Sequence, residues 1–203
     1  MSTSCGSFGS KCRQAGFSLI EVAVFIAVVG VGISGVILAI TTATRDSVDP
    51  LIRKQSVAIA ESLLEEIESM PFTFCDPDDP NAATATGPAD CTGGAGGPND
   101  EARLPLGPEA GETRYSGVTP FDNVSDYNGY NTALEAPPGI KDITGAPIAG
   151  LDVYNAAVTI TQTALGVVPA ADSLQISVTV TGPANTVVTV EGYRTQYAPN
   201  AVP

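Results

Sequence analysis

The chain has 203 residues with nine Lys or Arg, 22 Asp or Glu and no His, which gives a formal net charge of −13. Without His it cannot build His-dependent catalytic triads, His zinc ligands or a His general base. The acidic balance argues against nucleic acid as a partner, because phosphate binding needs clustered Lys and Arg. The length suits one modest domain with an appendage.

The N-terminal part contains a segment long enough to cross a membrane. The 23 residues from Val22 to Thr44 carry no charge, and a helix of that length spans about 34 Å, against a hydrocarbon core of about 30 Å. Lys11 and Arg13 precede it, so the positive-inside rule predicts a cytoplasmic N-terminus and an exported remainder. The run exceeds the roughly 7–15 apolar residues of a cleaved secretory signal.

Glu21 stands at the start of this apolar run. A plain signal anchor explains the length and flanks of the segment but gives Glu21 no role. A carboxylate in a membrane helix costs free energy and is by default a functional residue that needs a partner.

The string GFSLIEV (16–22), behind a short basic leader, resembles the class III signal of type IV prepilins and type II secretion pseudopilins. The resemblance implies that a prepilin peptidase cuts after Gly16 and methylates the new N-terminus at Phe17. Residues 1–16 are then a cleaved leader, and 17–44 form the transmembrane and filament-core helix. Other pilin subunits and the inner-membrane assembly platform are the implied partners.

Cleavage at this position supplies the missing partner of Glu21. It creates an amine on Phe17, four residues earlier, which the carboxylate can meet in its own chain or in a neighbouring subunit. A paired carboxylate in a dry filament core fixes axial register, whereas an unpaired one is costly. We hypothesise that Glu21 sets subunit stagger and recruitment during assembly.

Gly30, Gly32 and Gly35 spell the G-x-G-x-x-G of dinucleotide-binding folds. That fingerprint requires a preceding strand and a soluble βαβ unit. Inside a membrane span, small residues instead let helices approach closely, so nucleotide binding is the disfavoured interpretation.

A second helix, amphipathic, is expected over residues 45–70. Asp49-Pro50 is typical of a helix start, with Asp as N-cap and Pro at the first position, and Pro71 ends the segment. Pro50 could equally mark a kink or a melted turn. The apolar stripe comprises Ile52, Ile59, Leu63, Ile67 and Met70.

A Gly/Pro-rich loop is predicted over residues 76–112. Cys5 and Cys12 leave with the leader, while Cys75 and Cys91 stay in the exported part. An oxidising compartment favours a structural disulfide between them; zinc is disfavoured with two thiols and no His, and a reactive pair lacks C-x-x-C spacing. The DPDDP turn (76–80) is expected to be a solvated surface loop, without catalytic chemistry.

Three segments alternate apolar and polar residues and predict strands: 151–163, 174–181 and 186–195. The last two are joined through Gly182-Pro183-Ala184-Asn185 and predict an antiparallel hairpin. Three strands packed on an amphipathic helix can be stable. The expected fold is α+β and type IV pilin-like, with a long N-terminal helix against an antiparallel β-sheet head (71–203).

One segment hints at a ligand. Starting from Val124, Asp126, Asn128, Gly129 and Glu135 fall on positions 3, 5, 6 and 12 of an EF-hand calcium loop. Position 1 is not Asp, and the favoured interpretation is an Asn/Gly-rich turn with no metal. Calcium stays open as the alternative.

The stalk string DPLIRKQSVAIAESLLEEIESMPFTFCDPDDP and the later FDNVSDYNGY block resemble the minor pilins of mannose-sensitive haemagglutinin (MSHA) type IV pili. The resemblance implies a subunit that is incorporated into the pilus or primes its assembly, sits in the inner membrane with a periplasmic head, and then reaches the cell surface. A type II secretion pseudopilin and a membrane-anchored exported binding domain are the alternatives. No catalytic constellation or cofactor site is expected.

Overall fold

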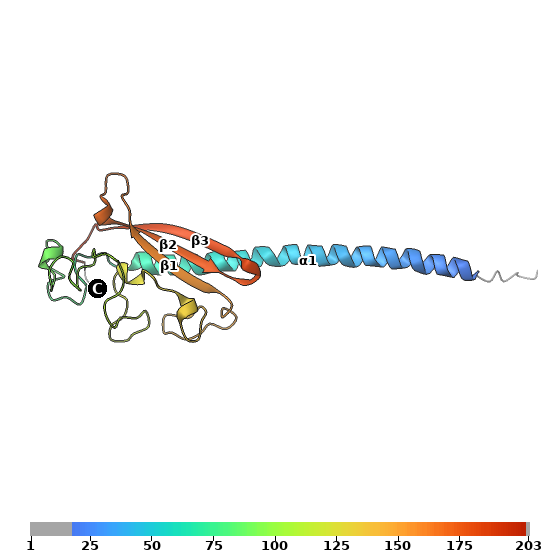
Figure 1. Ribbon diagram of the computed structural model, residues 1–203, viewed down its shortest axis with the longest axis horizontal. Helices are drawn as coiled ribbons and strands as arrows, with labels where there is room; N and C mark the ends of the chain where they lie inside the picture. Colours follow the sequence, from blue (N-terminus) through green and yellow to red (C-terminus); the bar gives the residue numbers. More distant parts are fainter. Residues whose placement is uncertain (1–17, 202–203) are drawn as a thin grey trace, which may run out of the picture. The chain divides into compact units, whose positions relative to one another are not determined.

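The computed structural model describes residues 18–201, with the backbone alone for 42–49. A long helix, α1 (Leu19–Ser69), leads into a loop region, and three strands follow: β1 (Asn155–Gln162), β2 (Ser173–Thr181) and β3 (Val187–Thr195) (Figure 1). Short 3-10 turns lie at Pro88–Asp90, Ser125–Tyr127, Thr132–Leu134, Ala170–Asp172 and Pro183–Asn185. The chain divides into two compact units, Met1–Ser47 and Val48–Pro203, which we call the anchor unit and the head.

Helix α1 continues through Pro50. The helix start expected at Asp49-Pro50 is therefore wrong. A proline removes one main-chain hydrogen bond of a helix, but the residues on both sides of Pro50 remain helical. The helix ends at Ser69, just before Pro71, as the sequence predicts.

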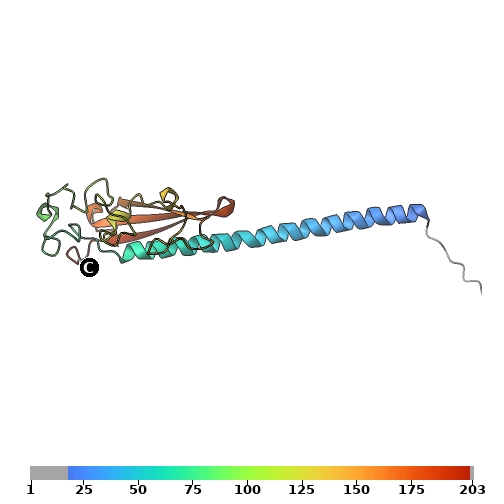
Figure 2. The ribbon, with the colours of Figure 1, turned by 90° about the horizontal axis from the view of Figure 1, so that it is seen from below.

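In the head, the last part of α1 packs on the sheet through the predicted apolar stripe. Leu63 and Ile67 are buried and Ile52, Ile59 and Met70 are partly buried against the same core. Figure 2 shows the three strands alongside the part of α1 that ends at Ser69. This arrangement confirms the predicted α+β class.

The sheet is antiparallel with the order β1-β2-β3, so β2 is central. Leu174, Ile176, Val178 and Val180 of β2 are fully buried, and their polar neighbours point to the other face. The β2–β3 hairpin turns at Gly182–Asn185, where the N–H of Gly182 donates to the carbonyl of Thr186 at 2.9 Å. The first strand is shorter than predicted, because residues 151–154 form a turn before β1 begins.

Gly192 lets β3 approach α1 closely. A Cβ at this position would lie 3.0 Å from the Leu64 Cδ1 atom and closer still to the Glu68 carboxylate. A larger residue here would require the Glu68 side chain to move away and Leu64 to shift.

The loop region between α1 and β1 is more buried than its composition suggests. Asp76 and Asp79 of the DPDDP turn are 7% and 4% exposed, so the expectation of a solvated surface loop is wrong for both. Cys75, Cys91, Ala82 and Ala85 form a second, small core. The segment also meets the end of the chain, since the Asn200 side chain donates to two of its carbonyls at 2.9 and 2.8 Å.

Candidate functional site

The anchor unit presents a candidate membrane span, Leu19–Thr41, with a mean hydropathy of 2.7 and none of the window buried. Its large apolar side chains are exposed, with Leu19 at 87% and Val31 at 75%. Such a surface needs a cover of lipid or of other apolar helices.

Glu21 lies in the first turn of α1, and its N–H donates to the carbonyl of Ser18 at 3.0 Å. Negative charge is favourable there, because the first turn exposes unpaired N–H groups and the positive end of the helix dipole. Gly16 and Phe17, the expected cleavage and methylation sites, lie outside the described residues, as do Cys5 and Cys12 of the leader.

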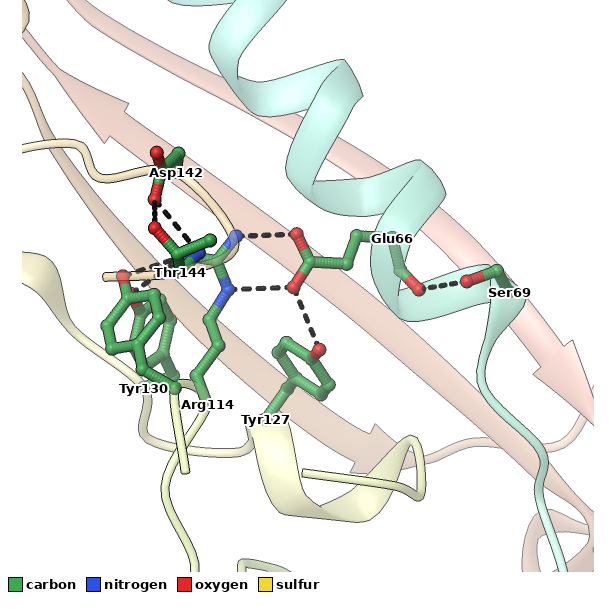
Figure 3. Close-up of polar contacts among 8 residues, drawn as sticks. Glu66, Ser69, Arg114, Tyr127, Tyr130, Asp142 and Thr144 are labelled. Atoms are coloured by element: carbon green, nitrogen blue, oxygen red, sulfur yellow. Dashed lines mark hydrogen bonds and ion pairs between the residues drawn. The ribbon is translucent and has the colours of Figure 1, made fainter. Parts of the chain in front are cut away.

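A polar cluster that sequence reasoning missed ties the head's loops to α1 (Figure 3). Arg114 donates twice to Glu66, from Nε to Oε1 at 2.7 Å and from Nη2 to Oε2 at 2.5 Å. The Tyr127 hydroxyl donates to the same Oε1 at 2.9 Å. The sequence did hold a clue to this cluster. Glu66 lies three residues after Leu63 and one before Ile67, so a charged residue borders the apolar stripe of the helix.

The electrostatics of this cluster favour the ion pair. Burial lowers the pKa of Arg114, but hydrogen bonds and charge from Glu66 more than offset that effect, so the pKa is raised. Burial and the Glu66 charge raise the pKa of Tyr127. Arg114 also lies over the rings of Tyr115 and Tyr130, with centroids at 5.1 and 5.5 Å. These contacts join α1, which carries Glu66, to the loop segments that carry Arg114 and Tyr127.

The structure joins Cys75 and Cys91 by a disulfide with an S–S distance of 2.06 Å. Both residues are buried, at 0% and 4% exposed. Cys75 also pairs with Asp100 in an antiparallel bridge. The disulfide therefore links the segment of Cys75, which lies beside Asp100, to the loop around Cys91.

The residues of the EF-hand-like spacing each have partners of their own. Asp126 accepts hydrogen bonds from two main-chain N–H groups of the turn before it, at 3.0 and 2.7 Å. Main-chain groups engage both ends of the Asn128 side-chain amide, at 2.9 and 2.8 Å. Glu135 forms an ion pair with Lys141 at 2.8 Å. Asp126 instead lies near carboxylates of other segments.

The family comparison bears on the N-terminal part of the chain. Residues 11–40 match the model of the prokaryotic N-terminal methylation motif. The chain carries a type IV prepilin-like signal. The match covers Glu21 and most of the apolar span, together with the two positions of the expected cleavage. Comparison with curated proteins and with solved structures gives no match.

The prepilin-like signal indicates a type IV pilin or pseudopilin, a structural rather than enzymatic class of protein. It implies processing by a prepilin peptidase and association with pilin subunits and the membrane. Together with the apolar helix it indicates membrane anchoring.

Proposed function

We propose that the chain is a minor pilin of a type IV pilus of the MSHA kind. The observation that carries the proposal is the methylation motif at residues 11–40, which continues into the exposed apolar span Leu19–Thr41. A small α+β head follows this span. That order suits a subunit that is stored in a membrane and then moved into a filament.

Processing comes first in this proposal. A prepilin peptidase cuts between Gly16 and Phe17 and methylates Phe17, with the N-terminus in the cytoplasm and the head in the periplasm. The new amine pairs with Glu21 of the same or a neighbouring subunit. The apolar span then exchanges lipid for the helices of other pilins, and its exposed surface is covered in both states.

The minor-pilin assignment is supported by resemblance. The stalk string that ends in DPDDP and the FDNVSDYNGY block look most like the minor pilin MshD of the MSHA system. A minor pilin acts at low copy, primes or modulates assembly and contributes to adhesion. A type II secretion pseudopilin shares the same signal and is the alternative.

The proposal is tested by following the chain into sheared surface pili, with Glu21→Ala and Glu21→Val variants. We expect wild-type chain at low copy in the pilus fraction and both variants retained in the membrane, because the Phe17 amine has lost its partner. Glu61→Ala, an exposed glutamate in the head part of α1, is the matched control and enters pili normally.

Normal entry of the Glu21 variants would contradict the assembly role. Restoration of type II secretion in a pseudopilin mutant, without any chain in pili, would replace the minor-pilin assignment with the pseudopilin alternative.

A further inference from the structure

Six carboxylates of the head converge from loop segments between α1 and β1. They belong to Asp76, Glu101, Glu109, Glu112, Asp122 and Asp126, which we call the acidic cluster. Asp76 and Glu101 are held together by the main chain. The N–H of Asp76 donates to the Asn99 carbonyl at 3.1 Å, and that of Glu101 donates to the Phe74 carbonyl at 3.2 Å.

The cluster consists of three overlapping triads, in each of which one carboxylate oxygen per residue lies within 4.8 Å of the others. The triads are Asp76–Glu112–Asp122, Asp76–Glu101–Glu109 and Glu109–Glu112–Asp126. Three residues belong to two triads each, so the six carboxylates form one connected group.

No basic side chain of the described chain forms an ion pair with this group. The described ion pairs are Arg114–Glu66 and Lys141–Glu135, and neither involves the cluster. Main-chain N–H groups donate to carboxylates of the cluster, and the Ser125 hydroxyl donates to Glu101. The Glu109 and Glu112 carboxyl groups also form a hydrogen bond with each other. These donors satisfy only some of the oxygens.

Two of the deepest oxygens have no partner. Glu101 Oε1 and Asp126 Oδ1 are buried and accept no hydrogen bond, although the residues are only 3% and 0% exposed. Both residues belong to the triads. A buried, unpaired carboxylate oxygen is costly unless a proton or a cation approaches it.

Burial, followed by repulsion from the neighbouring carboxylates, raises the pKa of Asp122 to about 7 and that of Glu101 well above its usual range. For Asp126, burial is the main cause of a pKa of about 8. Burial and mutual repulsion therefore both act against negative charge in the cation-free cluster. A bound cation would offset both effects.

We propose that the acidic cluster is a Ca²⁺ site in the head. All of its donors are carboxylate oxygens, the ligands that hard cations prefer, and the chain has no His. Two oxygens on opposite sides of Ca²⁺ lie up to about 5 Å apart at its usual bond lengths of about 2.3–2.6 Å, which fits the 4.8 Å limit of the triads. Mg²⁺ keeps several waters and takes fewer carboxylates.

Burial also favours a small ion over a basic side chain from another subunit. Asp126 is fully buried and Glu101 nearly so, and a Lys or Arg of a partner chain would need an open path to reach them. The bridge beside the Cys75–Cys91 disulfide carries Asp76 and Glu101. The bridge thus holds the main chains of two proposed ligands side by side before the ion binds.

The test uses the full chain purified in detergent micelles, stripped with EDTA and returned to chelator-free buffer at pH 7.5. Calcium titration by calorimetry and thermal melting should show saturable binding and a higher Tm. Asp126→Asn and Glu109→Gln should weaken binding by at least about 10–100-fold, the usual cost of disturbing a metal site. Glu191→Gln, an exposed site on β3, makes the same charge change and should bind normally.

The two cluster variants remain informative without calcium. Each replaces a crowded, buried carboxyl group by a neutral amide of nearly the same shape, so their metal-free Tm should equal or exceed that of the wild type, which shows that they fold. An unchanged wild-type Tm up to about 10 mM Ca²⁺, above the range typical of extracellular calcium modules, would overturn the proposal. So would an equal response to Mg²⁺ or an equal response of the variants. None of these outcomes depends on prepilin processing.

Discussion

Glu66 and Arg114 carry opposite charges at a place where α1 meets the loops of the head. Their side chains are 19% and 9% exposed, and the two parallel hydrogen bonds match the fork of the guanidinium to the carboxylate. Removal of one member leaves the other charge without its main partner in a dry site. The pair therefore specifies how the loops dock on α1.

Arg114→Met should lower the free energy of unfolding by about 2–3 kcal/mol, somewhat less than the roughly 3–5 kcal/mol lost from fully buried pairs. The double variant Glu66→Met/Arg114→Met should lose less than the sum of the two single variants, because it leaves no unpaired charge. Urea unfolding of all three proteins measures the coupling, and strictly additive losses would contradict it.

The acidic cluster gives the metal-free head a pH-dependent stability. The pKa values of Glu109 and Glu112 are about 7 and 8, raised first by burial from 4.5. The folded head therefore holds more protons than the unfolded chain between about pH 4.5 and 8, and stability falls as pH rises through that window.

In EDTA, the urea midpoint should be lower at pH 8 than at pH 5.5, and saturating Ca²⁺ should remove most of the difference. Glu109→Gln should flatten the metal-free profile, whereas Glu191→Gln should leave it unchanged. A midpoint that rises with pH in EDTA would show that the cluster does not titrate in this way.

At the scale of elements, the apolar run and the apolar periodicity were sufficient to predict the two halves of α1 and the β2–β3 hairpin, but not that the helix continues through Pro50. The stripe through Leu63 and Ile67 faces the core, and β2 alternates buried and partly exposed residues. These features could be predicted because apolar spacing directly reflects which side of an element is buried.

The loop region could not be predicted in the same way. Its residues have no period, and Asp76 approaches Glu101 only through a bridge between segments far apart in sequence. The spacing of Asp126 and Glu135 suggested one ligand set, whereas Glu135 pairs with Lys141. Burial of Asp76 and Asp79 likewise depends on tertiary contacts that composition does not encode.

The Cys75–Cys91 disulfide closes a loop with a sequence separation of 16 in this irregular region. Cys75→Ala/Cys91→Ala should lower the free energy of unfolding by about 3 kcal/mol, because the unfolded chain regains the entropy of an open loop of this size.

The disulfide prediction is checked by urea unfolding and by thiol titration of the denatured mature protein, which should show no free thiol before reduction. Cys5→Ser/Cys12→Ser changes the same residue type in the leader and should not affect mature stability. Two titratable thiols in the unreduced mature wild type would contradict the structural role.

For the whole molecule, the two units are suited to different surroundings. The described anchor span is apolar and exposed, whereas the head segment 71–203 has fifteen acidic and four basic residues. Such a chain needs a membrane or a filament around the first unit and water around the second. A prepilin differs from a permanent membrane anchor in that its basic leader, which here carries Lys11 and Arg13, is removed.

The N-terminus of the exported chain, read by intact-mass and peptide mass spectrometry, tests this account most directly. We expect the mature protein to begin with N-methylated Phe17 when a prepilin peptidase is present and to keep its leader when the peptidase is absent. A chain that still begins at Met1 in the presence of the peptidase would contradict the account and leave an ordinary membrane-tethered domain.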